Sequence, residues 1–125
     1  MWLFTTDGFF SAVAHRDDPE TVLVRSRVRE DALRLQESVG RGEVSETPDA
    51  DYGYRVLLSR ETWSAYLAAA GDTIDYPNFK NAVAARQGAD RARVYAGVWS
   101  VMFELQQREV EGADESAGET HGKGG

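Results

Sequence analysis

A chain of 125 residues is long enough to bury one hydrophobic core and too short for two ordinary domains. Apolar residues make up 42% of the chain, which argues against wholesale disorder, and the lack of cysteine excludes disulfides, thiolate metal sites and a cysteine nucleophile. The formal net charge of −7 disfavours non-specific binding of nucleic acid or anionic lipid, because these partners attract positively charged surfaces.

The start of the sequence carries no recognisable targeting signal. Residues 1–8 have neither a basic segment nor a long apolar core, so we expect no signal peptide. No apolar run approaches the roughly 20 residues that cross a bilayer. We therefore expect a cytoplasmic protein with no membrane partner, and a reducing compartment suits a chain without cysteine.

The first elements in the chain are predicted to be strands. Residues 2–6 and 9–14 are rich in aromatic and β-branched side chains and flank Asp7-Gly8, a pair that suits a two-residue hairpin turn. Residues 21–27 alternate between apolar and charged side chains, as a half-buried strand does. The sequence therefore predicts a hairpin followed by a third strand.

A helix and a further strand are predicted next. Apolar residues recur at helical spacing over residues 28–39, and Gly40 can end that helix in the left-handed conformation. Residues 41–51 are polar and predict a mobile loop, and residues 52–59 alternate again as a strand. The expected inward face of the helix consists of Val28, Ala32, Leu35 and Val39.

Three helices are predicted in the remainder of the chain. Ser59 can cap the first, which ends before Gly71, and residues 75–78 can start the second, which runs to Arg86. Asp90 can cap the third, which is expected to end at about Glu109. The expected inward positions are Trp63, Tyr66, Leu67 and Ala70 in the first, Phe79, Ala82 and Val83 in the second, and Val94, Val98, Val101 and Leu105, widened by Trp99 and Met102, in the third.

Strands joined by short turns, with helices grouped later, indicate an α+β fold. We expect a small, mainly antiparallel sheet of three to four strands, covered on one face by three to four helices. A ferredoxin-like plait is a looser alternative, because the C-terminal helical run is too long for it. Residues 1–110 are expected to form a single domain, and residues 111–125, which are rich in glycine and acids, a disordered tail.

The sequence offers no set of residues for catalysis. His15 is the one histidine in the expected domain, and His121 lies in the expected tail, so a histidine-based metal site or a serine triad is not predicted. A small metal-dependent hydrolase using Asp17, Asp18 or Asp75 is an alternative that no spacing of these residues favours. We expect no enzyme activity, no cofactor and no bound metal.

Arginines and aromatic residues are the candidates for binding. Arg16, Arg25 and Arg27 can form an anion-binding or nucleic-acid-binding face, although arginine is also common on the solvent-exposed face of a sheet without any binding role. Phe9 and Phe10 are adjacent in a strand and must point to opposite faces of the sheet. The exposed one is expected to be covered by a helix or by a second copy of the chain, which favours a homodimer through the sheet.

Five short segments of the chain form a distinctive set. They are Trp2-Leu3-Phe4-Thr5-Thr6-Asp7-Gly8-Phe9-Phe10-Ser11, Val24-Arg25-Ser26-Arg27-Val28, Asp51-Tyr52, Asp75-Tyr76-Pro77-Asn78-Phe79-Lys80 and Val98-Trp99. Together these segments resemble a family of short bacterial proteins with no established activity. The resemblance spans residues 1 to about 105, and Pro77 departs from it, because an acidic residue is expected there.

If such a family carries a site, the polar segment at residues 75–80 is the first candidate. Asp75, Tyr76, Asn78 and Lys80 offer a carboxylate, a phenol, an amide and an amine beside a helix start, although plain capping by Asp75 and Asn78 explains the same residues. The leading hypothesis is a non-enzymatic protein-interaction module that self-associates. The alternative is a nucleic-acid-associated accessory protein that uses an arginine-lined sheet face, whose binding would weaken steeply with salt.

Overall fold

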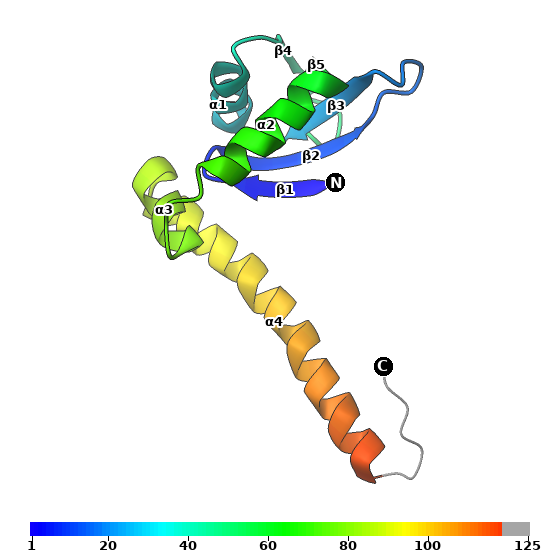
Figure 1. Cartoon of the computed structure of the whole chain (residues 1–125), viewed down its shortest axis with the longest axis vertical. Helices are drawn as coiled ribbons and strands as arrows, with labels where there is room; N and C mark the ends of the chain where they lie inside the picture. The colour runs from blue at the N-terminus through cyan, green and yellow to red at the C-terminus, as the bar shows by residue number, and fades with distance from the viewer. Residues whose placement is uncertain (119–125) are drawn as a thin grey trace.

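The protein has an α+β fold, seen in a computed structural model that describes residues 1–118 (Figure 1). Its antiparallel sheet has the strand order β1-β2-β3-β5-β4. The predicted α+β class with an antiparallel sheet is thereby confirmed, but the sheet has five strands instead of the expected three to four, and helices pack on both of its faces. The strands are β1 (Trp2–Thr5), β2 (Gly8–Ala14), β3 (Thr21–Ser26), β4 (Val44–Glu46) and β5 (Tyr54–Ser59), and the helices are α1 (Arg29–Val39), α2 (Arg60–Asp72), α3 (Phe79–Gln87) and α4 (Ala89–Gly118).

The main hydrophobic core lies between one face of the sheet and the helices α1 and α2. Alternate residues of the three central strands point into it, as the period of two in the sequence predicts. Phe10 and Leu35 are fully buried there, and Trp63 and Tyr66 of α2 stack with ring centroids 5.5 Å apart. The strand residues of this core are Phe10, Ala12, Val22, Val24, Val56 and Leu58.

The predicted hairpin β1–β2 is present, with its turn one residue earlier than expected. Thr5 pairs with Gly8, so the two loop residues are Thr6 and Asp7. Gly8 has φ +155°, and a Cβ added to it would lie 2.4 Å from the Cγ of Asp31 in α1. Glycine is therefore required at this position by both the backbone conformation and the close approach of a carboxylate.

Residues 41–51 are not only a loop, so the prediction for this segment is wrong in part. Val44–Glu46 forms the short edge strand β4, which pairs antiparallel with β5. A strand of three residues, two of them polar and exposed, shows almost no alternation of apolar and polar side chains. The hydrophobic pattern of the sequence therefore did not predict it. A short, polar edge strand also limits pairing with other chains.

Local signals set most helix ends as predicted. Gly40 ends α1 in the left-handed conformation with φ 71°, and the Ser59 hydroxyl accepts a hydrogen bond from the Thr62 backbone N–H at the start of α2. Asn78 caps α3 in the same way through Asn81 N. Two details differ: Val28 precedes α1 and is exposed, and α2 continues past Gly71 to Asp72.

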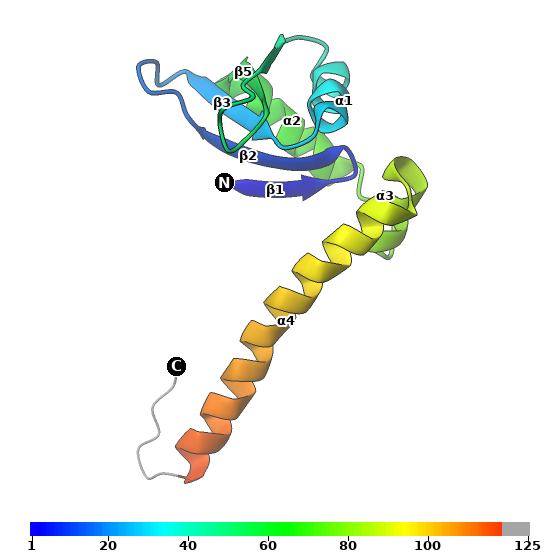
Figure 2. The same cartoon turned by 180° about the vertical axis from the view of Figure 1, so that it is seen from behind.

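The prediction for the last helix is wrong in its inward face and its end. Helix α4 begins at Ala89 and runs to Gly118, so Asp90 lies in its first turn and does not cap it. Its start packs against α3, and the rest extends away from the sheet (Figures 1 and 2). The expected tail at residues 111–125 is therefore helical as far as Gly118, and residues 119–125 lie outside the described residues.

Gly97 provides a direct test of this extended helix. It lies in the interior of α4, where an added Cβ meets no atom within 4 Å. We expect Gly97→Ala to stabilise the protein by up to about 1 kcal/mol, because alanine loses less backbone entropy in a helix.

Gly40→Ala is the matched control for this measurement by thermal unfolding. It also adds a methyl group in open space, but at a φ of 71° that alanine adopts with strain, so it should destabilise. A destabilising Gly97→Ala would contradict a continuous helix at this point.

Candidate interaction surface on α4

Helix α4 exposes a large apolar surface between Val94 and Val110. Trp99 is 66% exposed and Val94 64% exposed, whereas large apolar side chains normally lie inside. An exposed apolar patch of this kind marks an interaction site more often than a chance feature. We call the following residues the α4 apolar surface: Val94, Val98, Trp99, Val101, Met102, Phe103, Leu105 and Val110.

The α4 apolar surface covers more than half of the helix circumference. Its members are exposed on several sides, and the rings of Trp99 and Phe103 stack with centroids 5.1 Å apart. Between Val94 and Leu105 the polar side chains are Ser100 and Glu104, and with Arg93 and Glu111 their spacings of seven, four and seven place them on one side of the helix, which we call the polar strip. Four further polar residues follow Leu105 on other sides of the helix: Gln106, Gln107, Arg108 and Glu109.

The first turns of α4 are anchored on the sheet face opposite the main core. Tyr95 and Ala92 are buried beside Val83 of α3, and this cluster packs against Phe4 and Phe9 of the hairpin. The Tyr95 ring meets the Phe4 ring edge-on with centroids 5.1 Å apart. The helix is therefore held at its N-terminal end, and its apolar surface begins where this contact stops.

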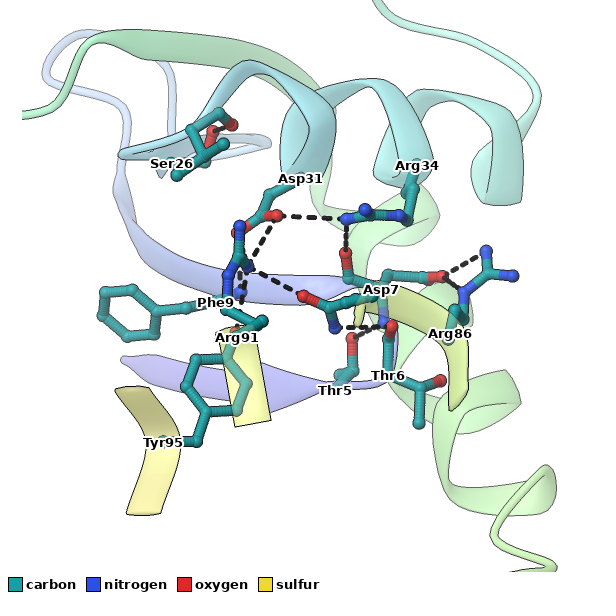
Figure 3. Close-up of polar contacts among 12 residues, drawn as sticks. Thr5, Thr6, Asp7, Phe9, Ser26, Asp31, Arg34, Arg86, Arg91 and Tyr95 are labelled. Carbon is teal, nitrogen blue, oxygen red and sulfur yellow. Dashed lines mark hydrogen bonds and ion pairs between the residues drawn. The ribbon is translucent and has the colours of Figure 1, made fainter. Parts of the chain in front are cut away.

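A buried carboxylate ties α4 to the body of the protein. Asp31 of α1 is only 2% exposed, and its oxygens accept hydrogen bonds from Arg91 Nη1 at 2.8 and 2.9 Å (Figure 3). Arg34 Nη1 and the Phe9 backbone N–H add further bonds at 3.1 Å each. With two guanidinium groups and one backbone donor, the buried charge of Asp31 is compensated.

The hairpin turn makes a second set of contacts to three helices. The Asp7 carboxylate accepts hydrogen bonds from Arg86 Nη2 of α3 at 2.9 Å and from the Tyr66 hydroxyl of α2 at 2.8 Å. Ser38 of α1 donates to the same carboxylate at 3.0 Å, and Arg34 donates to the Asp7 carbonyl oxygen at 2.9 Å. The turn is thus the point where α1, α2 and α3 meet.

Gln87 joins the two sets of contacts into one network. Its Nε2 donates to the Thr6 carbonyl at 2.7 Å, and its Oε1 accepts from Arg91 at 2.8 Å. Burial raises the pKa of the hydroxyls of Tyr66 and Tyr95, so both stay protonated hydrogen-bonding groups at neutral pH. Burial lowers the pKa of Arg91, but its bonds to Tyr95 and Asp31 outweigh this and raise it overall. The arrangement suits positioning of α4, since every carboxylate in it is engaged by an arginine.

The segment at residues 75–80 does not converge on one point. Asn78 caps α3, and Tyr76 leans against Phe79 with ring centroids 5.9 Å apart. Asp75 and Lys80 are exposed. The capping interpretation of Asn78 is confirmed, and the proposal that this segment forms a site stays a prediction.

The other residues that the sequence suggests for binding a partner or an anion lie in different parts of the structure. Phe10 lies in the main core, and Phe9 is half-buried beneath α3 and α4, so a helix of the same chain covers it. Arg25 and Arg27 meet on the ring of Tyr52, at 4.7 and 4.1 Å from its centroid. Arg16 lies in the exposed β2–β3 loop at the opposite end of β3, so the three arginines do not form one cluster.

Sequence reasoning missed the network around Asp7 and Asp31. From the sequence, Asp7 is predicted to be a turn residue, and Asp31 is predicted to be one of several charged residues on the surface of a helix. One signal was present: Asp31 lies four residues before Leu35 and therefore shares the buried side of α1. A carboxylate on an inward face needs a cationic partner, but nothing in the sequence names Arg91 as that partner.

Neither the described residues nor the comparisons with known proteins identify a metal site, a membrane-spanning helix or a family. Among residues 1–118 there is no group of three or more side chains suited to hold a metal ion, and no helix long and apolar enough to cross a membrane. No family model, no curated protein and no solved structure matches the chain. The resemblance to a family of short bacterial proteins therefore stays a prediction.

Proposed function

We propose that the protein is a non-enzymatic interaction module that self-associates through the α4 apolar surface. The observation that carries this proposal is the exposure of eight large apolar side chains on one helix that leaves the body of the protein (Figure 2). Burying such side chains contributes about 25 cal/mol per Å² of apolar area. The earlier expectation of a dimer through the sheet is replaced by one through α4, since α3 and α4 cover Phe9.

A second copy in antiparallel orientation is the occupant that the sequence of α4 favours. In a two-fold contact, residue i meets residue j and j meets i, so matching residues must lie equally far from the axis. Six of the exposed apolar positions satisfy this condition in pairs about Met102, whereas Val98 lies opposite Gln106. The pairs are Val94 with Val110, Trp99 with Leu105, and Val101 with Phe103.

The charge distribution favours the same orientation. At the start of α4, Arg91 is engaged by Asp31 and Arg93 is exposed, whereas residues 104–111 carry three acidic residues and one basic residue. An antiparallel pair about Met102 places Arg93 of each copy level with Glu111 of the other, and a parallel pair places like charges level with one another. The polar strip that includes Ser100 and Glu104 then faces water.

Anchoring of α4 supports association, because a surface held in position loses less entropy on binding than a loose one. The contacts of Arg91 with Asp31 and of Tyr95 with Phe4 fix the first turns of the helix. We therefore expect a dimer whose stability depends on the central apolar residues and not on the ends of α4.

Sedimentation equilibrium of paired variants tests the proposal. Met102→Glu places two carboxylates at the two-fold axis, and we expect it to raise the dimer dissociation constant by at least 100-fold, since a buried unpaired charge costs several kcal/mol. Ser100→Glu adds the same charge on the polar strip and should leave the dimer intact. A wild-type protein that stays monomeric at 100 µM, or equal effects of the two variants, would refute the proposal.

The orientation has its own test, because the chain contains no native cysteine. In the antiparallel pair, Met102→Cys meets its own copy and should form an intermolecular disulfide on mild oxidation. The two copies of Val94→Cys should be separated by about 24 Å along the helix axis and remain unlinked. Efficient cross-linking through Val94→Cys would show a parallel pair instead.

A further inference from the structure

A hollow of about 410 Å³ lies on the face of the sheet opposite α1 and α2. Hollows of this size are typical of small-ligand sites. Side chains from β3, the β2–β3 loop, β5 and the β4 region converge there. The lining residues are His15, Leu23, Glu43, Ser45, Arg55 and Leu57.

Two arginines face each other beside this hollow without a carboxylate between them. Arg25 of β3 is the direct cross-strand partner of Arg55 of β5, and like charges in that position repel. Among the described residues, neither guanidinium forms an ion pair with an acid. The arginines that do form one are Arg16, Arg29, Arg34, Arg86, Arg91, Arg93 and Arg108.

One of the two guanidinium groups is also incompletely satisfied. The Nε of Arg55 is buried and has no hydrogen-bond partner among the described residues. Arg25 is held in place by its bond to the Ser11 hydroxyl at 2.8 Å and by the ring of Tyr52 at 4.7 Å. A buried donor without an acceptor is costly, and an oxyanion contacting this guanidinium would compensate its charge.

Two other polar side chains of the hollow, those of His15 and Ser45, can also donate hydrogen bonds. The Nδ1 of His15 accepts hydrogen bonds from the backbone N–H groups of Asp17 and Asp18, both at 3.1 Å. In the neutral imidazole the proton must then lie on Nε2, which leaves an N–H donor. The Ser45 hydroxyl lines the same hollow and can donate too.

From these contacts we infer that the hollow binds a phosphate group, held by the guanidinium of Arg55 with His15 and Ser45 around it, while the neighbouring Arg25 adds positive charge from beside the hollow. Guanidinium forks match the geometry of phosphate oxygens, and hydroxyl and imidazole donors complete their coordination. Among the residues that the structure describes, Glu43 is the one acid that lines the hollow, and it limits the affinity through repulsion. This site is separate from α4 and independent of the proposed dimer.

Nuclear magnetic resonance titration of the full chain with inorganic phosphate tests the inference. At constant ionic strength, phosphate should shift the amide signals of His15, Ser45 and Arg55 saturably. Arg55→Gln should weaken binding at least tenfold, and Glu43→Gln should strengthen it about threefold or more. Arg60→Gln is the matched control, because Arg60 is exposed outside the hollow and its loss changes the net charge equally.

The possible outcomes distinguish specific phosphate binding in the hollow from non-specific attraction of anions, and they identify the source of the phosphate group. The inference is overturned if phosphate and chloride shift the same signals equally, if no signal of the hollow shifts, or if Arg60→Gln weakens binding as much as Arg55→Gln. Parallel titrations with adenosine monophosphate and with a single-stranded oligothymidylate distinguish a free phosphate ester from a nucleic-acid backbone. Either ligand supports the site if its binding also depends on Arg55.

Discussion

Replacing Asp31 by asparagine is expected to reduce the free energy of unfolding by about 3–5 kcal/mol, because it leaves a partly buried arginine without its anion. The side chain of Arg91 is only 18% exposed, and both of its bonds to Asp31 run to carboxylate oxygens. An asparagine of the same shape keeps one oxygen but turns an amide N–H₂ toward a guanidinium. Urea denaturation followed by circular dichroism measures the loss.

Glu30→Gln provides the control for the change of charge. Glu30 precedes Asp31 in the first turn of α1 and is exposed, so its neutralisation should change stability by no more than about 0.5 kcal/mol. A double-mutant cycle with Arg91→Met should give a coupling energy of about 1–3 kcal/mol between Asp31 and Arg91. Equal effects of Glu30→Gln and Asp31→Asn, or additive effects in the cycle, would contradict the buried ion pair.

Gly8→Ala is the second substitution with a large expected effect, a loss of about 2–4 kcal/mol. Its Cβ would lie 2.4 Å from Cγ and 2.6 Å from Oδ2 of Asp31, so the carboxylate must move away from Phe9 N and Arg91. The backbone at φ +155° adds strain for a residue with a side chain. Thermal unfolding measures the total loss of stability. The hydrogen-exchange rate of the Phe9 amide reports the loss of its hydrogen bond to the displaced carboxylate.

Gly53→Ala is the control for Gly8→Ala. It shows whether the loss of stability comes from the close approach to Asp31 or from replacing any glycine of the sheet region by alanine. The added methyl group there meets only the Arg27 carbonyl oxygen, at an ordinary 3.8 Å. We expect the stability to change by less than about 1 kcal/mol. A Gly8→Ala protein as stable as Gly53→Ala would show that Asp31 does not occupy the position described for it.

Much of the fold could be predicted because local patterns decide it. The alternation of Val22 and Val24, the cap at Ser59 and the stop at Gly40 each depend on neighbours in sequence. The apolar positions of α4 misled the prediction for a physical reason. A stripe such as Val94 and Val98 shows that a helix needs an apolar neighbour, but not whether its own chain supplies that neighbour.

The candidate surfaces were less predictable, because they depend on contacts between distant residues. Arg25 was identified as an anion-binding candidate from sequence, but its cross-strand partner Arg55 follows only from the register of β3 and β5. Arg16 was grouped with Arg25 by proximity along the chain, although the strand between them carries it to the other end of the sheet. Spacing alone does not give register, and register decides which charges meet.

The link between the first hairpin and the last helices also has a consequence during synthesis. Asp7 and Arg86 are separated by 79 residues, and Asp31 and Arg91 by 60. At 5–20 residues per second, a ribosome needs roughly 3–12 s to proceed from Asp31 to Arg91. Throughout that interval the nascent sheet must keep the Asp31 carboxylate hydrated, so its final packing should wait until α3 and the start of α4 have emerged.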